Sequence, residues 1–324
     1  MRASPLLTVC LALAALLNLA FWYVTNQPQD AGPGLVGPIR SVSFAPFREG
    51  QSPLTKTYPS RAEIEQDLAL LQGKVRGVRT YTSREGMEAV PELAGKYGIK
   101  VTHSAWLGNE EPVNRAEVKA LIKAANEHPD SIERVIVGNE VLLRRDLKPQ
   151  ELIESIREVK RAVKQPVSYA DVWAFYLKYP EVAKEVDFLT IHILPYWEDE
   201  PVGIDEVGAH IERIYRKMQA AFPGKPILIG EAGWPTAGRS RGPAAPGVVN
   251  SARFLRNLVA VAEKNGFDYN VVEAFDQPWK SKLEGTVGAN WGYISVDRQP
   301  RFPLDGPVVE HSDWTRRFAR SMAL

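Results

Sequence analysis

The chain has 324 residues, 44% hydrophobic and 24% charged, so it has an ordinary globular composition and a length that suits one large α/β barrel or two smaller domains. Its 40 Lys and Arg residues nearly balance its 39 Asp and Glu residues, which excludes the overall basic excess typical of nucleic-acid-binding proteins. Cys10 is the only cysteine, which excludes an internal disulfide and a thiolate zinc site. The five histidines lack ligand-like spacing, so we expect no metal and no other cofactor.

The first element is an apolar segment over residues 6–24, long enough to cross a membrane as a helix. Phe21, Trp22 and Tyr23 stand at its far end, where an aromatic belt would lie, and Arg2 favours a cytoplasmic N-terminus. A cleaved signal peptide is the alternative, but its apolar core would be unusually long. The expected organisation is a membrane anchor over residues 1–25, a Pro- and Gly-rich linker over 26–38, and a domain over 39–324 on the periplasmic side of an inner membrane.

Eight short β-rich runs follow the linker, separated by amphipathic stretches. One stretch opens with a capping-box pattern in which Glu63 follows Ser60, another opens at Pro149, and two more cover residues 204–221 and 248–264. Strand–helix alternation at about 30-residue spacing implies a parallel sheet, either a closed (β/α)₈ TIM barrel or an open doubly wound sheet. The count of eight and the lack of a Gly-rich phosphate loop favour the barrel. The expected strands cover residues 39–44, 75–81, 99–105, 134–137, 166–170, 187–193, 226–229 and 269–275.

Two glutamates stand at the ends of strongly apolar strands of the expected barrel. Glu140 follows the fourth strand and Glu231 follows the seventh, each beside glycine and near aromatic residues. A single such glutamate is more often a helix cap or a surface ion pair, but two at matching strand ends point to the catalytic face of a barrel. Paired carboxylates suit glycoside cleavage, because one donates a proton to the leaving oxygen while the other attacks or stabilises the anomeric carbon. Burial and mutual repulsion would separate their pKa values.

Several strings around these glutamates resemble glycoside hydrolase family 17, the β-1,3-glucanase family, and especially its bacterial membrane-attached members. The strings are VRTY, VGNE, the Pro-Tyr-Trp at residues 195–197, GEAGWPTAG, AFDQPWK and NWGY, and the resemblance covers roughly residues 40–305. It implies that Glu140 is the general acid/base and Glu231 the nucleophile of a retaining reaction through a covalent glycosyl-enzyme.

The resemblance also implies roles for neighbouring residues. Asn139 would contact the sugar 2-hydroxyl, and Tyr81 and Tyr196 would line the −1 subsite, with Tyr196 hydrogen-bonded to the nucleophile. Lys280 and Glu284 would belong to a supporting polar network.

The chain departs from plant members of the family at positions that leave the catalytic pair intact. His192 stands where they have Asn, Leu194 where they have Tyr, and Asp276-Gln277 where they have Asp-Glu. We count His192 and Asp276 among the expected sugar contacts. The departures argue against a simple transfer of plant-type endo-hydrolase specificity to this chain.

Tryptophans gather after the expected strands, whereas core residues would fall mid-strand or on helix faces. Flat apolar rings suit the faces of sugars, with plain core packing as the alternative. Trp279 and Trp291 are the best candidates for the cleft, Trp173 and Trp234 are further candidates, and Trp234 could instead wedge the turn after Glu231. The other tryptophans in these positions are Trp106 and Trp197. Insertions over residues 197–203 and 237–247 would either extend the groove or close it.

The leading interpretation is a retaining enzyme that acts on β-1,3-glucan in periplasmic glucan remodelling or branching, with a lean towards transglycosylation over hydrolysis. A glucan synthase that supplies the substrate is a candidate partner. The alternatives are a strict endo-β-1,3-glucanase, a non-catalytic glucan-binding barrel, and a barrel lyase or aldolase. Retention requires carboxyl groups about 5–5.5 Å apart, against about 6.5–9.5 Å for inversion.

Overall fold

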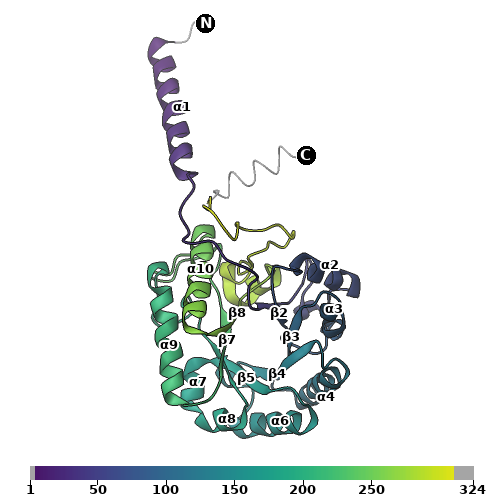
Figure 1. Ribbon diagram of the computed structural model, residues 1–324. Helices are drawn as coiled ribbons and strands as arrows, with labels where there is room; N and C mark the ends of the chain where they lie inside the picture. The colour runs from purple at the N-terminus through teal and green to yellow at the C-terminus, as the bar shows by residue number, and fades with distance from the viewer. Residues whose placement is uncertain (1–3, 310–324) are drawn as a thin grey trace.

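The computed structural model describes residues 4–309 as a closed barrel of parallel strands inside a ring of helices, with helix α1 standing clear of it (Figure 1). Each strand pairs with the next along the chain, and β8 returns to pair with β1. This closure confirms the expected (β/α)₈ barrel, since an open doubly wound sheet would keep two edge strands. Arg2, His311 and the last part of the expected domain, residues 310–324, lie outside the described residues.

All eight expected strands are present, with shifted ends. The fourth, fifth and seventh continue two or three residues further than expected, because backbone pairing runs on through polar residues at the mouth, so Glu231 lies inside its strand. The eighth ends earlier, at Val271. The strands are β1 Val42–Ser43, β2 Gly77–Arg79, β3 Lys100–Ala105, β4 Ile132–Asn139, β5 Val167–Val172, β6 Leu189–His192, β7 Ile227–Ala232 and β8 Asp268–Val271.

The helices form the outer layer, and all four stretches expected to be amphipathic are helical. The capping box of α2 is confirmed, because Ser60 and Glu63 bond each other's backbone N–H groups. In α6 the residues that face the barrel are Leu152, Ile153, Ile156 and Val159, all of them buried. The longer helices are α2 Arg61–Leu71, α3 Val90–Lys96, α4 Glu111–Glu127, α6 Pro149–Ala162, α9 Val207–Ala221 and α10 Val248–Asn265; the short ones are α5 Val141–Arg144, α7 Trp173–Lys178, α8 Pro180–Glu185 and α11 Ser281–Glu284.

Helix α1, Pro5–Thr25, carries the apolar N-terminal segment and makes no part of the barrel (Figure 1). Its residues Pro5–Val24 are long and apolar enough to cross a membrane, and none of this stretch is buried. A signal sequence has the same properties, so the choice between anchor and signal stays a prediction.

The expected linker is bound to the barrel domain rather than free. Gln29 and Val308 exchange two backbone hydrogen bonds with N···O distances of 2.7 and 2.9 Å, and the Leu35 N–H donates to the Leu304 carbonyl at 3.0 Å. Ala31 is buried between these contacts. We call residues 29–35 the strap, because they tie the end of α1 to the last described segment of the chain.

One arginine of α10 holds the strap in place. The buried guanidinium of Arg256 donates to the carbonyl of Gly32 at 2.7 Å, and also to the carbonyls of Pro303 and Gly306 at 3.1 and 2.8 Å. One side chain therefore joins three carbonyls of two segments that lie far apart in the sequence.

Replacing that arginine should release the strap without unfolding the barrel. We expect Arg256→Ala to make residues 26–38 sensitive to limited proteolysis, because the carbonyl contacts that order them are lost. Cleavage is followed by mass spectrometry on the full chain. Lys264→Ala, which removes an exposed cation from the same helix, is the control, and its residues 26–38 should be cleaved as slowly as those of the wild type. Equal protection of the strap in Arg256→Ala and the wild type would contradict this role.

Candidate active site

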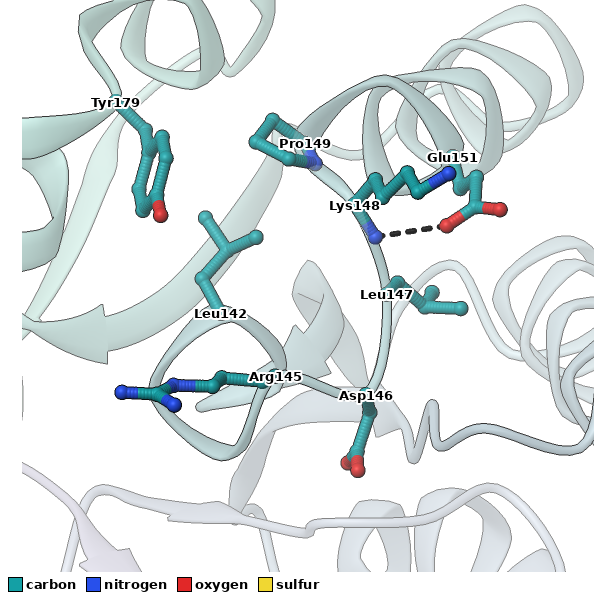
Figure 2. A pocket seen from close by; sticks show the side chains of 8 residues that line it. All are labelled: Leu142, Arg145, Asp146, Leu147, Lys148, Pro149, Glu151 and Tyr179. Atoms are coloured by element: carbon teal, nitrogen blue, oxygen red, sulfur yellow. Dashed lines mark hydrogen bonds between the residues drawn. The ribbon is translucent and has the colours of Figure 1, made fainter.

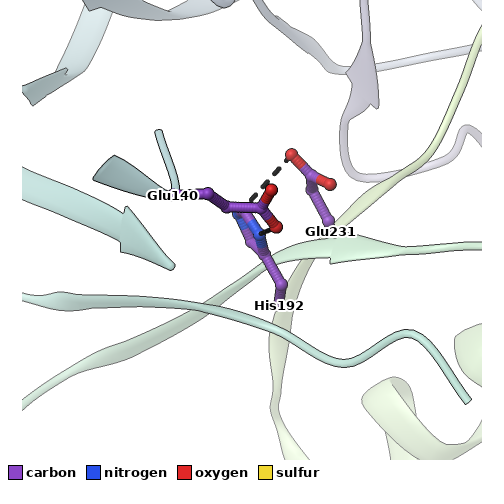
Figure 3. A group of neighbouring side chains, drawn as sticks. All are labelled: Glu140, His192 and Glu231. Atoms are coloured by element: carbon purple, nitrogen blue, oxygen red, sulfur yellow. Dashed lines mark hydrogen bonds and ion pairs between the residues drawn. The ribbon is translucent and has the colours of Figure 1, made fainter. Parts of the chain in front are cut away.

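Two glutamates meet at the C-terminal mouth of the barrel (Figure 3). Glu140 follows β4 and Glu231 lies near the end of β7, so both side chains reach the face where barrel enzymes carry their chemistry. A carboxylate oxygen of one lies within 4.8 Å of a carboxylate oxygen of the other. Their side chains are 23% and 11% exposed respectively, so both are largely enclosed yet open to the mouth.

Irregular strand ends aim these side chains. The pairing register shifts between Ile136 and Asn139 on β4, and again between Ile191 and His192 on β6. Such bulges turn side chains out of the regular alternation of a strand. Glu140 itself adopts a left-handed conformation with φ of 53°, which costs a non-glycine residue about 1–2 kcal/mol. The backbone at the mouth is therefore shaped to present Glu140.

Arg144, in the helical turn after Glu140, braces this strained backbone. Its guanidinium donates to the carbonyl of Leu107 at 2.8 Å and to the carbonyl of Asn139. It also lies 4.3 Å from the centre of the Trp106 ring, in a cation–π contact. This explains the place of Trp106, which supports the turn beside Glu140.

Arg79, at the end of β2, crosses the mouth and joins three strands. Its side chain is fully buried and donates to Glu231 Oε1 at 3.1 Å and to the Gly230 carbonyl at 2.7 Å. Its second terminal nitrogen donates to Asn139 Oδ1 at 2.6 Å. The guanidinium thus forms an ion pair with Glu231, and its bond to Oδ1 of Asn139 leaves the amide nitrogen of Asn139 as the donor for another partner.

His192, at the end of β6, lies between the two glutamates (Figure 3). Its Nδ1 is 2.8 Å from Glu140 Oε1, its Nε2 is 3.5 Å from Glu231 Oε1, and its side chain is fully buried. The expectation that it contacts a sugar is therefore wrong, because carboxylates enclose both ring nitrogens. Burial acts to raise the pKa of Glu140, but the hydrogen bond and charge of His192 outweigh it and hold that pKa below its ordinary value.

Tyr81 and Tyr196 differ in what they reach. The Tyr81 hydroxyl is 2.9 Å from Ser43 Oγ, and its ring lies 4.9 Å from the Arg79 guanidinium. Burial and the charge of Glu231 raise the pKa of Tyr81, so it remains a neutral phenol at this site. The Tyr196 hydroxyl donates to the carbonyl of Arg239 at 2.5 Å, so the expected hydrogen bond to Glu231 is wrong.

Tyr196 instead belongs to an aromatic cluster with Trp197, Trp234 and Trp291. Its ring meets these three edge-on at 4.8, 6.5 and 5.9 Å, and Trp197 stacks on Trp291 at 6.3 Å. Trp234 is 1% exposed and donates to the Ala245 carbonyl. It therefore packs the turn after Glu231 and has no face open for stacking on a sugar. Trp291 is 4% exposed, against 37% for Trp197, so Trp197 is the open ring of the cluster.

Beyond β8, Lys280 forms the centre of a charged network. Its Nζ lies 2.9 Å from both oxygens of Glu273, which is fully buried. Burial raises the pKa of Glu273 to about 7, although Lys280 opposes the shift. Burial lowers the pKa of Lys280, but the charges of Glu273 and Glu284 more than reverse this effect. Lys280 and Glu284 therefore lie in one network, with Glu273 as its buried anchor.

Asp276 and Trp279 are engaged within the protein. Asp276 is buried in an ion pair with Arg301 and accepts from the Gly292 N–H at 3.0 Å. It holds the loop that carries Trp291. The expected contact of Asp276 with a sugar is wrong, because Gly292 and Arg301 engage its two carboxylate oxygens. Trp279 is half-buried and donates to Gln277 at 2.9 Å.

Trp173, expected to bind substrate, lines a cavity separate from the two glutamates, and its contact with a sugar stays a prediction. Its indole donates to Glu198 at 3.2 Å, and Lys217 lies 4.4 Å from its ring. It lines a cavity of about 570 Å³ with Glu198 and His210, and neither Glu140 nor Glu231 lines that cavity. A smaller cavity of about 350 Å³, formed by residues 145–149 with Leu142, Glu151 and Tyr179, also excludes both (Figure 2).

Glu140, His192 and Glu231 also offer three donor atoms of metal-binding type, the one such group found within residues 4–309. Protein partners already engage these atoms. The Arg79 guanidinium lies 3.1 Å from Glu231 Oε1 and would repel a second cation, and Glu140 is bonded to His192. The donor set fits proton sharing better than metal binding.

The residues that sequence reasoning missed are charged side chains within apolar strands or turns. Arg79 and Glu273 are each flanked by residues of a buried strand or its extension, and a charge there needs a partner. That pattern was a usable signal for both. Arg144 gave no such signal, because it lies in an ordinary helical turn.

Comparison with known proteins agrees with this geometry. Residues 41–292 match the family model described as the BtgE/BtgC glycoside hydrolase domain. A glucan 1,3-beta-glucosidase of Arthroderma benhamiae is 30% identical over 78% of this chain and 87% of its own length.

Solved structures give the same result. A glycoside hydrolase family 17 β-1,3-glucanosyltransferase from Rhizomucor miehei has a TM-score of 0.72 and 27% identity, covering 83% of this chain and 98% of its own. An active-site mutant of the Rhizomucor miehei β-1,3-glucanosyltransferase in complex with laminaritriose has a TM-score of 0.71 and 27% identity, over 81% and 95%.

Removing the charge of Arg79 should destabilise the barrel and disorder its mouth. We expect Arg79→Met to lower the free energy of unfolding by about 3–5 kcal/mol, because it leaves the carboxylate of Glu231 without its buried partner. Urea denaturation measures the change. Arg76→Met, at an exposed position on the chain leading into β2, is the control and should stay within about 0.5 kcal/mol of the wild type. Equal losses in both variants would refute the bridging role.

Proposed function

We propose, since this chain belongs to glycoside hydrolase family 17, that it cleaves β-1,3-glucan with retention of configuration through a covalent glycosyl-enzyme. One observation carries the proposal: carboxylate oxygens of Glu140 and Glu231 approach within 4.8 Å of each other. That spacing suits the retaining separation of about 5–5.5 Å and leaves no room for the water of an inverting reaction. As a family 17 chain it is an enzyme, so the alternative of a non-catalytic glucan-binding barrel is set aside.

The two glutamates take different roles because their partners differ. Glu231 is ion-paired with Arg79, which suits a nucleophile that attacks the anomeric carbon. Glu140 is hydrogen-bonded to a histidine that can carry a proton, which suits a general acid and base. Glu140 protonates the departing glycosidic oxygen as the bond from C1 to Glu231 forms. It then takes a proton from the incoming hydroxyl, which attacks C1 and releases Glu231.

Neighbouring residues position the sugar in this proposal. The amide nitrogen of Asn139 donates to the sugar 2-hydroxyl, since its oxygen is engaged by Arg79. Tyr81 lines the −1 subsite beside Arg79. Trp197, the open ring of the aromatic cluster, offers a stacking face for a sugar beyond the cleavage point.

We favour transfer to a second sugar over hydrolysis. A glucanosyltransferase from Rhizomucor miehei shares the fold and 27% of the sequence, and a stacking face for an acceptor sugar favours its attack over that of water. A strict endo-β-1,3-glucanase is the second candidate, because the intermediate is common to both.

The cellular setting follows from α1. If it is retained as an anchor, the enzyme works on glucan at the periplasmic face of an inner membrane, in remodelling or branching. A glucan synthase in the same membrane would then be the source of substrate. Mass measurement of the mature protein tests the anchor, since cleavage would remove the mass of α1.

Incubation of the enzyme with laminari-oligosaccharides tests the reaction. We expect products both longer and shorter than the substrate, and NMR of the first products should show retained β-configuration. Glu140→Gln should lose about 10²–10⁴-fold in rate, and Glu231→Ala at least as much. Glu158→Gln, an exposed position on α6, is the control and should match the wild type.

Each outcome bears on a separate part of the proposal. Only shorter products would select the endo-hydrolase. An inverted product would refute the covalent intermediate, and wild-type turnover by Glu140→Gln or Glu231→Ala would refute the assignment of the pair.

A further inference from the structure

His192 is enclosed so completely that its proton partners are the two glutamates. Its side chain is 0% exposed, its Nδ1 lies 2.8 Å from Glu140 Oε1, and its Nε2 faces Glu231 Oε1 at 3.5 Å (Figure 3). Nε2 has no hydrogen-bond partner within residues 4–309. A ring so placed exchanges protons with water through Glu140, the more exposed of the two carboxylates.

The number of donors on the ring restricts the protonation states of this group. A neutral imidazole has one donor and one acceptor, whereas an imidazolium has two donors. If both glutamates are ionised, a neutral ring would place a nitrogen lone pair opposite one carboxylate, and the two would repel each other. The state with two ionised glutamates therefore requires a charged ring. With Glu140 protonated, Nδ1 accepts from Glu140 and Nε2–H points to Glu231. These two states hold the same number of protons and differ by one proton moved along the 2.8 Å contact.

We infer that His192 holds in reserve the proton that Glu140 delivers to the leaving glycosidic oxygen. The inference rests on the proposed function and extends it. The proton sits on Nδ1 in the free enzyme and passes to Glu140 as substrate displaces water from the mouth. The C1–O bond then breaks, the C1 bond to Glu231 forms, and the proton leaves with the departing sugar. In the second half-reaction the attacking hydroxyl returns a proton to Glu140, from which Nδ1 recovers it.

The lowered pKa of Glu140 supports this assignment. Burial raises that pKa, but the bond to His192 and its charge lower it more, with smaller help from Arg144 and Arg79. A general acid in this condition needs a proton source within hydrogen-bond reach, and His192 is that source.

Charged groups from four elements of the barrel surround the ring. From β5, Asp171 acts on it, and burial raises the pKa of this aspartate to about 6. From β7 it faces Glu231, and from the turn after β4 it faces Glu140. Arg79, from β2, approaches the same space near Gly230 and opposes the charge. The ring thus lies among three carboxyl groups, with the guanidinium groups of Arg79 and Arg144 as the nearby cations.

His192→Asn tests the inference by pH profile, since an amide can donate to Glu140 but cannot yield a proton at working pH. The wild-type pair should keep its last proton to a higher pH than Glu140 alone, because two hydrogen-bonded bases share that proton, whereas in His192→Asn only the carboxyl group can hold it, with Arg144 and Arg79 opposing the burial that raises its pKa. We expect the alkaline limb of kcat/KM on laminaritriose to lie at lower pH in His192→Asn than in the wild type. His210→Asn, which removes a buried histidine paired with Glu198 outside the cluster, should leave the limb unmoved.

A substrate that needs no acid separates proton supply from support of the structure. With dinitrophenyl β-laminaribioside the leaving group departs unprotonated, so His192→Asn should keep most of the wild-type kcat/KM. An equal loss on both substrates at every pH would overturn the inference. Inactivity of the wild type on both would instead refute the proposed function.

The proton can also be observed without turnover. In protein labelled with ¹⁵N-histidine, the His192 ring signals are those missing from His192→Asn. We expect the doubly protonated ring to persist at least about one pH unit higher in the wild type than in Glu140→Gln, which lacks the carboxylate that holds the charge. The same midpoint in both proteins would overturn the inference whatever the enzyme acts on.

Discussion

The guanidinium of Arg79 is a full charge in the interior of the barrel, and the arrangement of the mouth depends on how that charge is matched. An unmatched charge there would be prohibitively costly, so Glu231, Asn139 and the Gly230 carbonyl must stay in contact with it. These partners come from β4 and β7, while Arg79 comes from β2. One electrostatic requirement therefore sets the relative positions of three strand ends and, with them, of Glu231 and Asn139.

Around this centre the mouth divides into a rigid part and a part carried by loops. The charged groups stand on strand ends, where backbone pairing fixes them to neighbouring strands. The aromatic cluster of Tyr196, Trp197, Trp234 and Trp291 stands on the segments after β6, β7 and β8. The charged groups and the aromatic cluster thus rest on different supports, strand ends for the first and loops for the second.

Much of this could be read from the sequence, for physical reasons. Strand periodicity and the capping box at Ser60 are local signals, and they predicted all eight strands and the starts of α2, α6 and α10 correctly, whereas α9 starts at Val207 after a 3-10 turn over residues 204–206. Glu140 and Glu231 could be found because strand ends in a barrel converge on one face. Trp234 and Tyr196 could not be placed, because exposure and hydroxyl partners depend on contacts between distant segments. The same holds for Glu273, whose counter-ion follows it on a later turn.

The strap changes what kind of motion the barrel can make. Few residues separate α1 from the first hydrogen bond at Gln29, and Arg256 clamps the segment that follows. The barrel cannot rotate freely about a long tether. If α1 is retained in a membrane, the strap keeps the barrel close to the bilayer, so encounters with glucan would occur within a thin layer next to it.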